Sequence, residues 1–306
     1  MNDKVSVLLP LYGTFDPEKV KMGIASLKNQ KNIDLEISVA EQSTKPTLSG
    51  IRGVTYEHSL PVFSSDGYLI PGLVRNLAAK NSSGNFIYNN DGDIIFGNPN
   101  YLNSLLQLIK KDEKLCLYQP AMRRIPLDNF VDFKNRFERG GIKKTIDDLD
   151  LSQPYGATYK DNFIKIRHFK KDNDGDVEIS VATEKDHRAY HSGDNKGKEP
   201  FFYTLHIHAG GTMMARSQFE KIGGYCEDFA GWGCHDVDIQ YKLKSLFNLQ
   251  KIHKISDLEI LHLDHQRGYF ANPRWEKNKS LLIKRQSMPI ENITNSDRER
   301  YNDIRI

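Results

Sequence analysis

Two acidic side chains in the first third of the chain are spaced for metal chemistry. Asp91 and Asp93 are separated by Gly92 and follow the segment 85–90, which is predicted to be a strand around Phe86, Ile87 and Tyr88. Carboxylates at the end of such a strand face the crevice where α/β sheets bind ligands, and their oxygens suit Mg²⁺ or Mn²⁺. A cation held there can neutralise charge on a departing diphosphate. The alternative is a structural turn, which an Asp-Gly pair also favours.

A second acidic group lies in the segment 231–238, which reads GWGCHDVD. Asp236 and Asp238 fall in the first turn of a predicted helix, where carboxylates compensate the helix dipole. The segment also permits a functional interpretation, because glycines let the backbone approach a ligand closely. The ring of Trp232 can then stack on a sugar, and Asp236 can take a proton from a nucleophile.

Histidines supply a further candidate ligand. His262 and His265 end the last predicted strand, 258–261. A neutral imidazole at this position can complete a metal site begun by Asp93. The alternative is a structural role for both histidines.

The elements that must position these residues alternate between strand and helix. Short apolar runs predict strands at 5–9, 35–40, 54–57, 85–90, 201–208 and 258–261. Apolar residues at helical spacing predict helices at 17–28, 70–80, from about 98 to 109, at 219–222 and from 235. This order predicts an α/β fold with a mostly parallel sheet, which binds ligands at the carboxyl ends of its strands. Segment 10–13, Glu41 and the Asp91–Asp93 pair fall at such ends.

Composition excludes several classes of function. The 306 residues contain 43 Lys plus Arg and 40 Asp plus Glu, a net charge of +3, and the two signs alternate along the chain. Without a basic patch, we expect no nucleic-acid partner. No apolar run approaches the roughly 20 residues of a membrane-spanning helix, and the N-terminus does not resemble a signal peptide. We therefore expect a cytoplasmic protein with at most peripheral contact at the inner membrane face.

Three scattered cysteines, Cys116, Cys226 and Cys234, predict no disulfide framework. No CxxC pair accompanies Cys226, Cys234 and His235, so a structural zinc site is not expected either.

The middle and the end of the chain differ in character from the rest. Residues from about 123 to 200 are rich in charge and glycine and predict an insertion with mobile loops, with candidate strands at 163–169 and 177–181. Residues 276–306 are polar and charged, and we expect a peripheral helix followed by a loose tail.

Three motifs, taken in order, resemble one family. They are VSVLLPLYG from residue 5, LVRNLAAKNSSGNFIYNNDGDIIF from residue 73 and GGTMMARSQFEKIGGYCEDFAGWGCHDVDI from residue 210. They are similar to glycosyltransferases of the GT-A fold, family 2 type, with a C-terminal half like that of galactosyltransferases and polypeptide N-acetylgalactosaminyltransferases. The resemblance covers about residues 4–115 and 203–270.

The resemblance implies a Rossmann-like, mixed and mostly parallel sheet flanked by helices, with a central insertion. A single domain would span residues 1–275, with a donor-nucleotide half at about 1–115 and an acceptor and catalytic half at about 201–270. The residues 276–306 would form a polar C-terminal helix or tail.

The resemblance also implies a role for each matched residue. The residues that would bind the donor nucleotide are Pro10, Tyr12, Glu41, Arg75, Asp91, Asp93 and Gly211. Asp93 would hold Mn²⁺ or Mg²⁺ together with His262, with His265 as the fallback ligand. The acceptor would contact Trp232 and His235, and the catalytic base would be Asp236. This chain departs from the family at Cys234 and His235, where Gly and Glu are common, and at Glu41, where many members have Asp.

These roles imply an inverting, metal-dependent transfer of a hexose or N-acetylhexosamine from a UDP-sugar, with UDP-Gal or UDP-GalNAc favoured, to a hydroxyl of a glycan acceptor. The acceptor can be a polysaccharide, a lipid-linked oligosaccharide or a protein-attached glycan. One alternative is a metal-dependent sugar-nucleotide hydrolase or nucleotidyltransferase, which would leave residues 232–238 without a role. Another is a non-catalytic carbohydrate-binding module of the same fold, which would be expected to lose at least one of Asp93, Asp236 and the histidine ligand.

Overall fold

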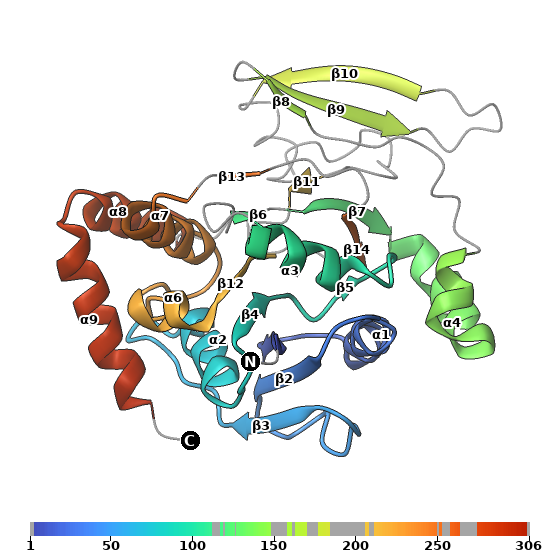
Figure 1. The fold of residues 1–306 in the computed structure, drawn as a ribbon, viewed down its shortest axis with the longest axis horizontal. Coiled ribbons are helices and arrows are strands. Elements are labelled where there is room, and N and C mark those ends of the chain that lie inside the picture. The colour runs from blue at the N-terminus through green and yellow to red at the C-terminus, as the bar shows by residue number, and fades with distance from the viewer. Residues whose placement is uncertain are drawn as a thin grey trace.

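The computed structural model describes residues 3–111, 117–118, 120–125, 127–147, 158–160, 163–169, 177–183, 206–207, 211–249, 251–252, 258–263 and 274–304. Figure 1 shows a main sheet with helices around it, a second sheet beside it and a three-stranded sheet at one end of the molecule. Helices α8 and α9 lie on one side of the main sheet, and α4 lies on the opposite side.

The main sheet contains the first part of the chain and has the strand order β12-β4-β1-β2-β3. Its strands are β1 (Val5–Tyr12), β2 (Leu35–Gln42), β3 (Thr55–Ser59), β4 (Phe86–Asn89) and β12 (Met213–Ala215). β3, β2, β1 and β4 are parallel and β12 is antiparallel to β4. The central strand β1 buries Val5, Val7, Leu8 and Leu9 almost completely, as expected for a strand covered on both faces. The predicted mixed, mostly parallel α/β sheet is confirmed.

Three predicted helices flank this sheet: α1 (Pro17–Lys28), α2 (Pro71–Lys80) and α3 (Tyr101–Lys111). The α1 helix begins after Asp16, whose carboxylate accepts a hydrogen bond from the N–H of Glu18 at 2.9 Å and so caps the first turn. The α2 helix packs against β1 and β2. The helix runs antiparallel to the strands. Arg75 in its middle contacts Asp91 beyond the end of β4, whereas the N–H of Gly84, after the helix, donates to Ser6 Oγ near the start of β1 at 2.8 Å.

A second sheet has the order β11-β7-β14-β5. Its strands are β5 (Ile94–Ile95), β7 (Ala121–Ile125), β11 (His206–Ile207) and β14 (Glu259–Leu263), and a separate parallel pair consists of β6 (Leu117–Tyr118) and β13 (Lys251–Ile252). The strand predicted at 258–261 corresponds to β14. Of the strand predicted at 201–208, only β11 lies within the described residues.

The segment 123–200, which was predicted to be an insertion with mobile loops, includes a helix that was not predicted from the sequence. This helix, α4 (Leu127–Asp147), bends at Gly141, which has a φ of 70°. It buries Phe133, Ile142 and Ile146 against Met22 and other apolar side chains. The strands β8 (Thr158–Lys160), β9 (Phe163–Phe169) and β10 (Val177–Thr183) form an antiparallel sheet, which confirms both candidate strands.

The C-terminal part contains α6 (Arg216–Lys221), α7 (His235–Phe247), α8 (Arg274–Gln286) and α9 (Ile290–Asp303). The prediction of a loose tail is wrong, because α9 buries Ile293 and Tyr301 and packs against α6 and α7. A strip of apolar side chains on an otherwise polar helix is sufficient for this packing. Within the described residues, no helix combines the length and apolar character that crossing a membrane requires.

Candidate active site

The predicted site residues of the first half gather at the carboxyl edge of the main sheet. Register places Tyr12 beside Gln42 at the ends of β1 and β2, and β4 pairs with β1 only as far as Asn89. Pro10 is buried just before this edge and beyond the length of β1 that pairs with β4, so its missing N–H costs no hydrogen bond on that side. The segment that follows Asn89 therefore lies at the same carboxyl edge of the sheet.

Arg75 links this edge to the second half of the chain. Its guanidinium is 1% exposed, and its Nη2 lies 2.7 Å from Asp91 Oδ1 and 3.9 Å from Asp236 Oδ1. The guanidinium also lies over the ring of Tyr225, with 5.2 Å between the guanidinium carbon and the ring centre. Burial by itself lowers the pKa of Arg75, but Tyr225 and the two carboxylates raise it above its ordinary value. The side chain therefore stays charged and holds Asp91 and Asp236 near one point.

Asp236 lies at the start of α7 with its carboxylate partly exposed. It is the second residue of α7, and its side chain is 22% exposed, so solvent reaches it. The hydroxyl of Tyr225 makes a long hydrogen bond of 3.5 Å to Oδ1, and His235 Nε2 lies 3.4 Å from Oδ2. The carboxylate is thus held from two sides and remains open to an incoming group.

Asp93 and His262 form the candidate metal pair, as the resemblance implied. The pairing of β5 with β14 brings them together: the N–H of Leu263 donates to the Asp93 carbonyl at 2.9 Å, and His262 is in register with Ile94. Asp93 Oδ2 lies 3.3 Å from His262 Nε2. Two ligands of one octahedral cation, each about 2.1 Å from it, lie about 3 Å apart, so this donor pair fits a divalent ion. The fallback ligand His265 lies outside the described residues.

The loop before α7 is held in a fixed shape. Gly231 and Gly233 have positive φ, and Asn278 Nδ2 donates to the carbonyls of Ala230, Trp232 and Gly233 at 2.9–3.2 Å. The ring of Trp232 stacks on Trp275, with 5.2 Å between ring centres. Sequence reasoning missed Trp275 and Asn278, because they come from a helix with no recognisable motif.

His235 and Glu41, which were predicted to contact the acceptor and the donor nucleotide, are both buried in the structure. His235 is 5% exposed and its ring lies beside Tyr225 and Asp236, so its burial argues against direct contact with an acceptor. Glu41 is 1% exposed. Its carboxylate accepts hydrogen bonds from Ser43 Oγ, Thr47 N, Thr47 Oγ1, Leu48 N and Tyr56 Oη.

These hydrogen bonds keep the carboxyl group of Glu41 ionised and attach it to the loop 43–48. Burial raises the pKa of Glu41, but the hydrogen bonds outweigh it and the pKa is lowered. The carboxylate therefore fixes the loop 43–48 at the end of β2. Gly211 is buried just before Thr212, whose carbonyl accepts a hydrogen bond from Asn89 N at 3.0 Å.

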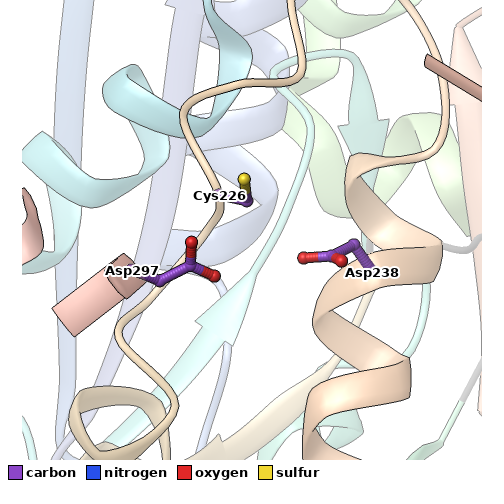
Figure 2. Close-up of side chains that lie close together, drawn as sticks. All are labelled: Cys226, Asp238 and Asp297. Carbon is purple, nitrogen blue, oxygen red and sulfur yellow. The ribbon is translucent and has the colours of Figure 1, made fainter. Parts of the chain in front are cut away.

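Three buried side chains, those of Cys226, Asp238 and Asp297, form a further cluster (Figure 2). Their ligand atoms lie within 4.8 Å of one another, as a metal site would require. However, Arg285 donates to Asp238 at 2.7 and 3.0 Å and to Asp297 at 2.6 Å, and Lys242 Nζ lies 2.6 Å from Asp297. Two buried cations therefore already neutralise the two carboxylates, so we interpret this cluster as a structural ion-pair network.

The chain is similar to known proteins in part of its sequence and in its fold. A family described as the N-terminal domain of galactosyltransferase matches residues 195–265. The S. aureus protein TarS, as residues 1–349 in complex with UDP, has a similar structure with a TM-score of 0.50 and 12% identity, over 98% of this chain and 71% of TarS. Mannosyltransferase PcManGT from Pyrobaculum calidifontis, in complex with GDP-Man and Mn²⁺, gives a TM-score of 0.52 and 12% identity, over 97% and 70%. By sequence, no curated protein matches the chain significantly.

These comparisons establish the fold. The chain has the GT-A glycosyltransferase fold, which confirms the resemblance predicted from the three motifs.

Proposed function

We propose that this protein is an inverting, metal-dependent glycosyltransferase that moves a hexose or N-acetylhexosamine from a UDP-sugar to a hydroxyl of a glycan acceptor. UDP-Gal and UDP-GalNAc are the favoured donors, because the matching family is a galactosyltransferase domain. One observation supports the proposal above all. The base Asp236 and the diphosphate-side residue Asp91 lie on either side of the same buried guanidinium, Arg75.

This arrangement assigns a task to each side chain. Asp236 Oδ accepts the proton of the acceptor hydroxyl as the oxygen attacks C1 of the donor sugar, and the bond from C1 to the diphosphate oxygen breaks on the opposite face. Arg75 holds the carboxylate in place and supplies a fixed positive charge close to the departing diphosphate. Trp232, stacked on Trp275, offers an aromatic face to a sugar ring.

The metal pair completes the proposal. Asp93 and His262 would hold Mn²⁺ or Mg²⁺, and a bound divalent cation stabilises negative charge on a leaving diphosphate. The acceptor is a polysaccharide, a lipid-linked oligosaccharide or a protein-attached glycan, with the protein acting in the cytoplasm.

The test measures release of UDP from UDP-sugars and of GDP from GDP-mannose, with Mn²⁺ and with a chelator. We expect one UDP-sugar to be hydrolysed slowly, only with metal. Asp236→Asn should lower this turnover by about 10²- to 10⁴-fold while keeping affinity for UDP. Asp93→Ala should abolish the metal dependence. The exposed carboxylate of Asp132 on α4 offers a matched control, and Asp132→Asn should leave turnover unchanged.

The products distinguish the alternatives. A pyrophosphohydrolase would release sugar 1-phosphate and UMP in place of UDP. A nucleotidyltransferase supplied with pyrophosphate would release sugar 1-phosphate and UTP. A non-catalytic module would bind sugar nucleotide with equal affinity in wild type and Asp236→Asn, and neither would show turnover. If calorimetry detects no binding of UDP with Mn²⁺, the proposed nucleotide site is refuted.

A further inference from the structure

A pocket of about 380 Å³ lies between the end of α2, helix α6 and helix α9, away from the catalytic edge. Its position follows from the direction of α2. Arg75 in this helix contacts Asp91 beyond the end of β4, and the helix ends at Lys80, shortly before β4 begins. Arg216 confirms this placement, since its Nε donates to the carbonyl of Gly84 at 2.6 Å just before β4 begins. The pocket is therefore separate from the residues assigned to the donor.

Three cations from separate segments line this pocket: Lys80, Arg216 and Arg298. Within the part of the chain that the structure describes, none of them forms an ion pair with a carboxylate. The pocket lining contains one carboxylate, that of the exposed Glu220. The described lining therefore carries three positive charges and one negative charge, which favours an anion.

The hydrogen bonds of the two arginines leave this positive charge in place. Arg216 donates to the carbonyls of Gly84 and Ala79 and to Ser82 Oγ at 2.6–3.1 Å, and all of these are neutral acceptors. Arg298 Nη2 donates to the carbonyl of Lys221 at 2.8 Å. Its Nε is buried and has no hydrogen-bond partner among the described residues. A buried N–H without a partner is costly, and an anionic acceptor would satisfy it.

A buried tyrosine adds a further donor. Tyr301 is 4% exposed and lines the pocket, and its hydroxyl has no hydrogen-bond partner within the described ranges. Lys80 Nζ lies 4.4 Å from the centre of its ring, which ties the ammonium to the pocket wall. Burial and the nearby Glu220 raise the pKa of Tyr301 to about 12, so its hydroxyl remains protonated and can donate.

A purely structural explanation accounts for only part of this arrangement. Lys80 lies in the last turn of α2 and Arg216 covers the carbonyl of Ala79, so both stabilise the negative end of that helix. Arg298 belongs to α9, and its Nη2 donates to the carbonyl of Lys221, the last residue of α6, so one of its donors serves that helix end. The two helix ends therefore leave the buried Nε of Arg298 and the Tyr301 hydroxyl unexplained.

We propose that this pocket binds the phosphate group of a second ligand, between Lys80, Arg298 and Tyr301. Tetrahedral oxyanions accept several charge-assisted hydrogen bonds at once, and guanidinium groups match their geometry. The same chemistry is offered by a soluble phosphate compound and by the headgroup of an anionic lipid. The site does not depend on the proposed transferase activity.

The first test titrates inorganic phosphate into the metal-free protein and follows the midpoint of thermal unfolding and the heat of binding. Wild type should bind, and the affinity should fall as the salt concentration rises. Lys80→Met and Arg298→Met should each weaken phosphate binding by about tenfold, the effect of losing one charge-assisted hydrogen bond. Arg136, an exposed arginine on α4, is the matched control, and Arg136→Met should leave binding unchanged.

A second arm identifies the source of the phosphate. Vesicles of phosphatidylglycerol and of phosphatidylcholine are sedimented with wild type and with Arg298→Met. If phosphatidylglycerol vesicles retain wild type but not Arg298→Met, and phosphatidylcholine vesicles retain neither protein, the ligand is a lipid headgroup. Phosphate binding without retention would indicate a soluble ligand. The proposal is overturned if wild type binds neither probe, or if folded Lys80→Met and Arg298→Met proteins, checked by circular dichroism, bind phosphate as wild type does.

Discussion

Replacing Arg285 by methionine should destabilise the protein strongly, although Arg285 lies in a polar segment far from any sequence motif. Its guanidinium is buried and donates to Asp238, which is fully buried, and to Asp297, which is 3% exposed. In the variant, Lys242 alone faces both carboxylates, with its Nζ 2.6 Å from Asp297 and 3.9 Å from Asp238. One buried negative charge is then left without a partner.

Removing one member of a buried ion pair costs about 3–5 kcal/mol in the free energy of unfolding. For a chain of this size that loss corresponds to a decrease of roughly 6–20 °C in the midpoint of thermal unfolding. Arg300 provides the comparison, because its pair with Asp228 is nearly half exposed on both sides. Arg300→Met should cost at most about 1 kcal/mol.

The assay is urea denaturation of wild type, Arg285→Met and Arg300→Met at several pH values. The hydrogen bonds and charges of Lys242 and Arg285 outweigh burial and lower the pKa of Asp297. A lowered pKa contributes stability that is present above the ordinary pKa and is lost as the pH falls through the folded-state value. The cost of Arg285→Met should therefore shrink in acid. Equal stabilities of wild type and Arg285→Met at pH 7, or a cost that does not change with pH, would refute the reasoning.

Three further predictions concern the active site and acid stability. Gly233→Ala should abolish transfer, because φ is 101° there and a Cβ would meet the ring of Trp275 at 2.3 Å. The measurement is UDP release. The control is Gly97→Ala, where the nearest atom to an added Cβ is 3.6 Å away. Glu41→Gln should raise KM for the donor by about tenfold, since the loop 43–48 loses charge-assisted hydrogen bonds; an unchanged KM would contradict that role. Burial raises the pKa of Glu36, but its hydrogen bonds outweigh burial and lower the pKa to about 2. These hydrogen bonds should therefore stabilise the folded protein fully above about pH 4.5, and this stability should be lost as the pH falls toward 2. An acid titration of wild type against Glu36→Gln measures this difference.

Local spacing determined much of the fold from the sequence alone. Strands such as 5–9 and helices such as 17–28 carry an apolar period that is set within a few residues, and both were predicted close to their observed bounds. The position of Asp91 and Asp93 after a strand was predictable for the same reason. The helix α4 was missed because the paired glycines 140–141 and its charged residues hide the spacing of its apolar side chains.

Tertiary structure alone decided how distant residues combine. Asp93 and His262 are separated by more than half of the chain, and the pairing of β5 with β14 brings them together. The bridge from Arg75 to Asp236, and the burial of Asp238 against Arg285, likewise arise where separate elements pack. A sequence pattern encodes the period of its own segment, whereas the partner of a charge or a ligand depends on which segments pack against it. For that reason the residue types of the site were visible in the sequence, and their electrostatic partners became visible only in the fold.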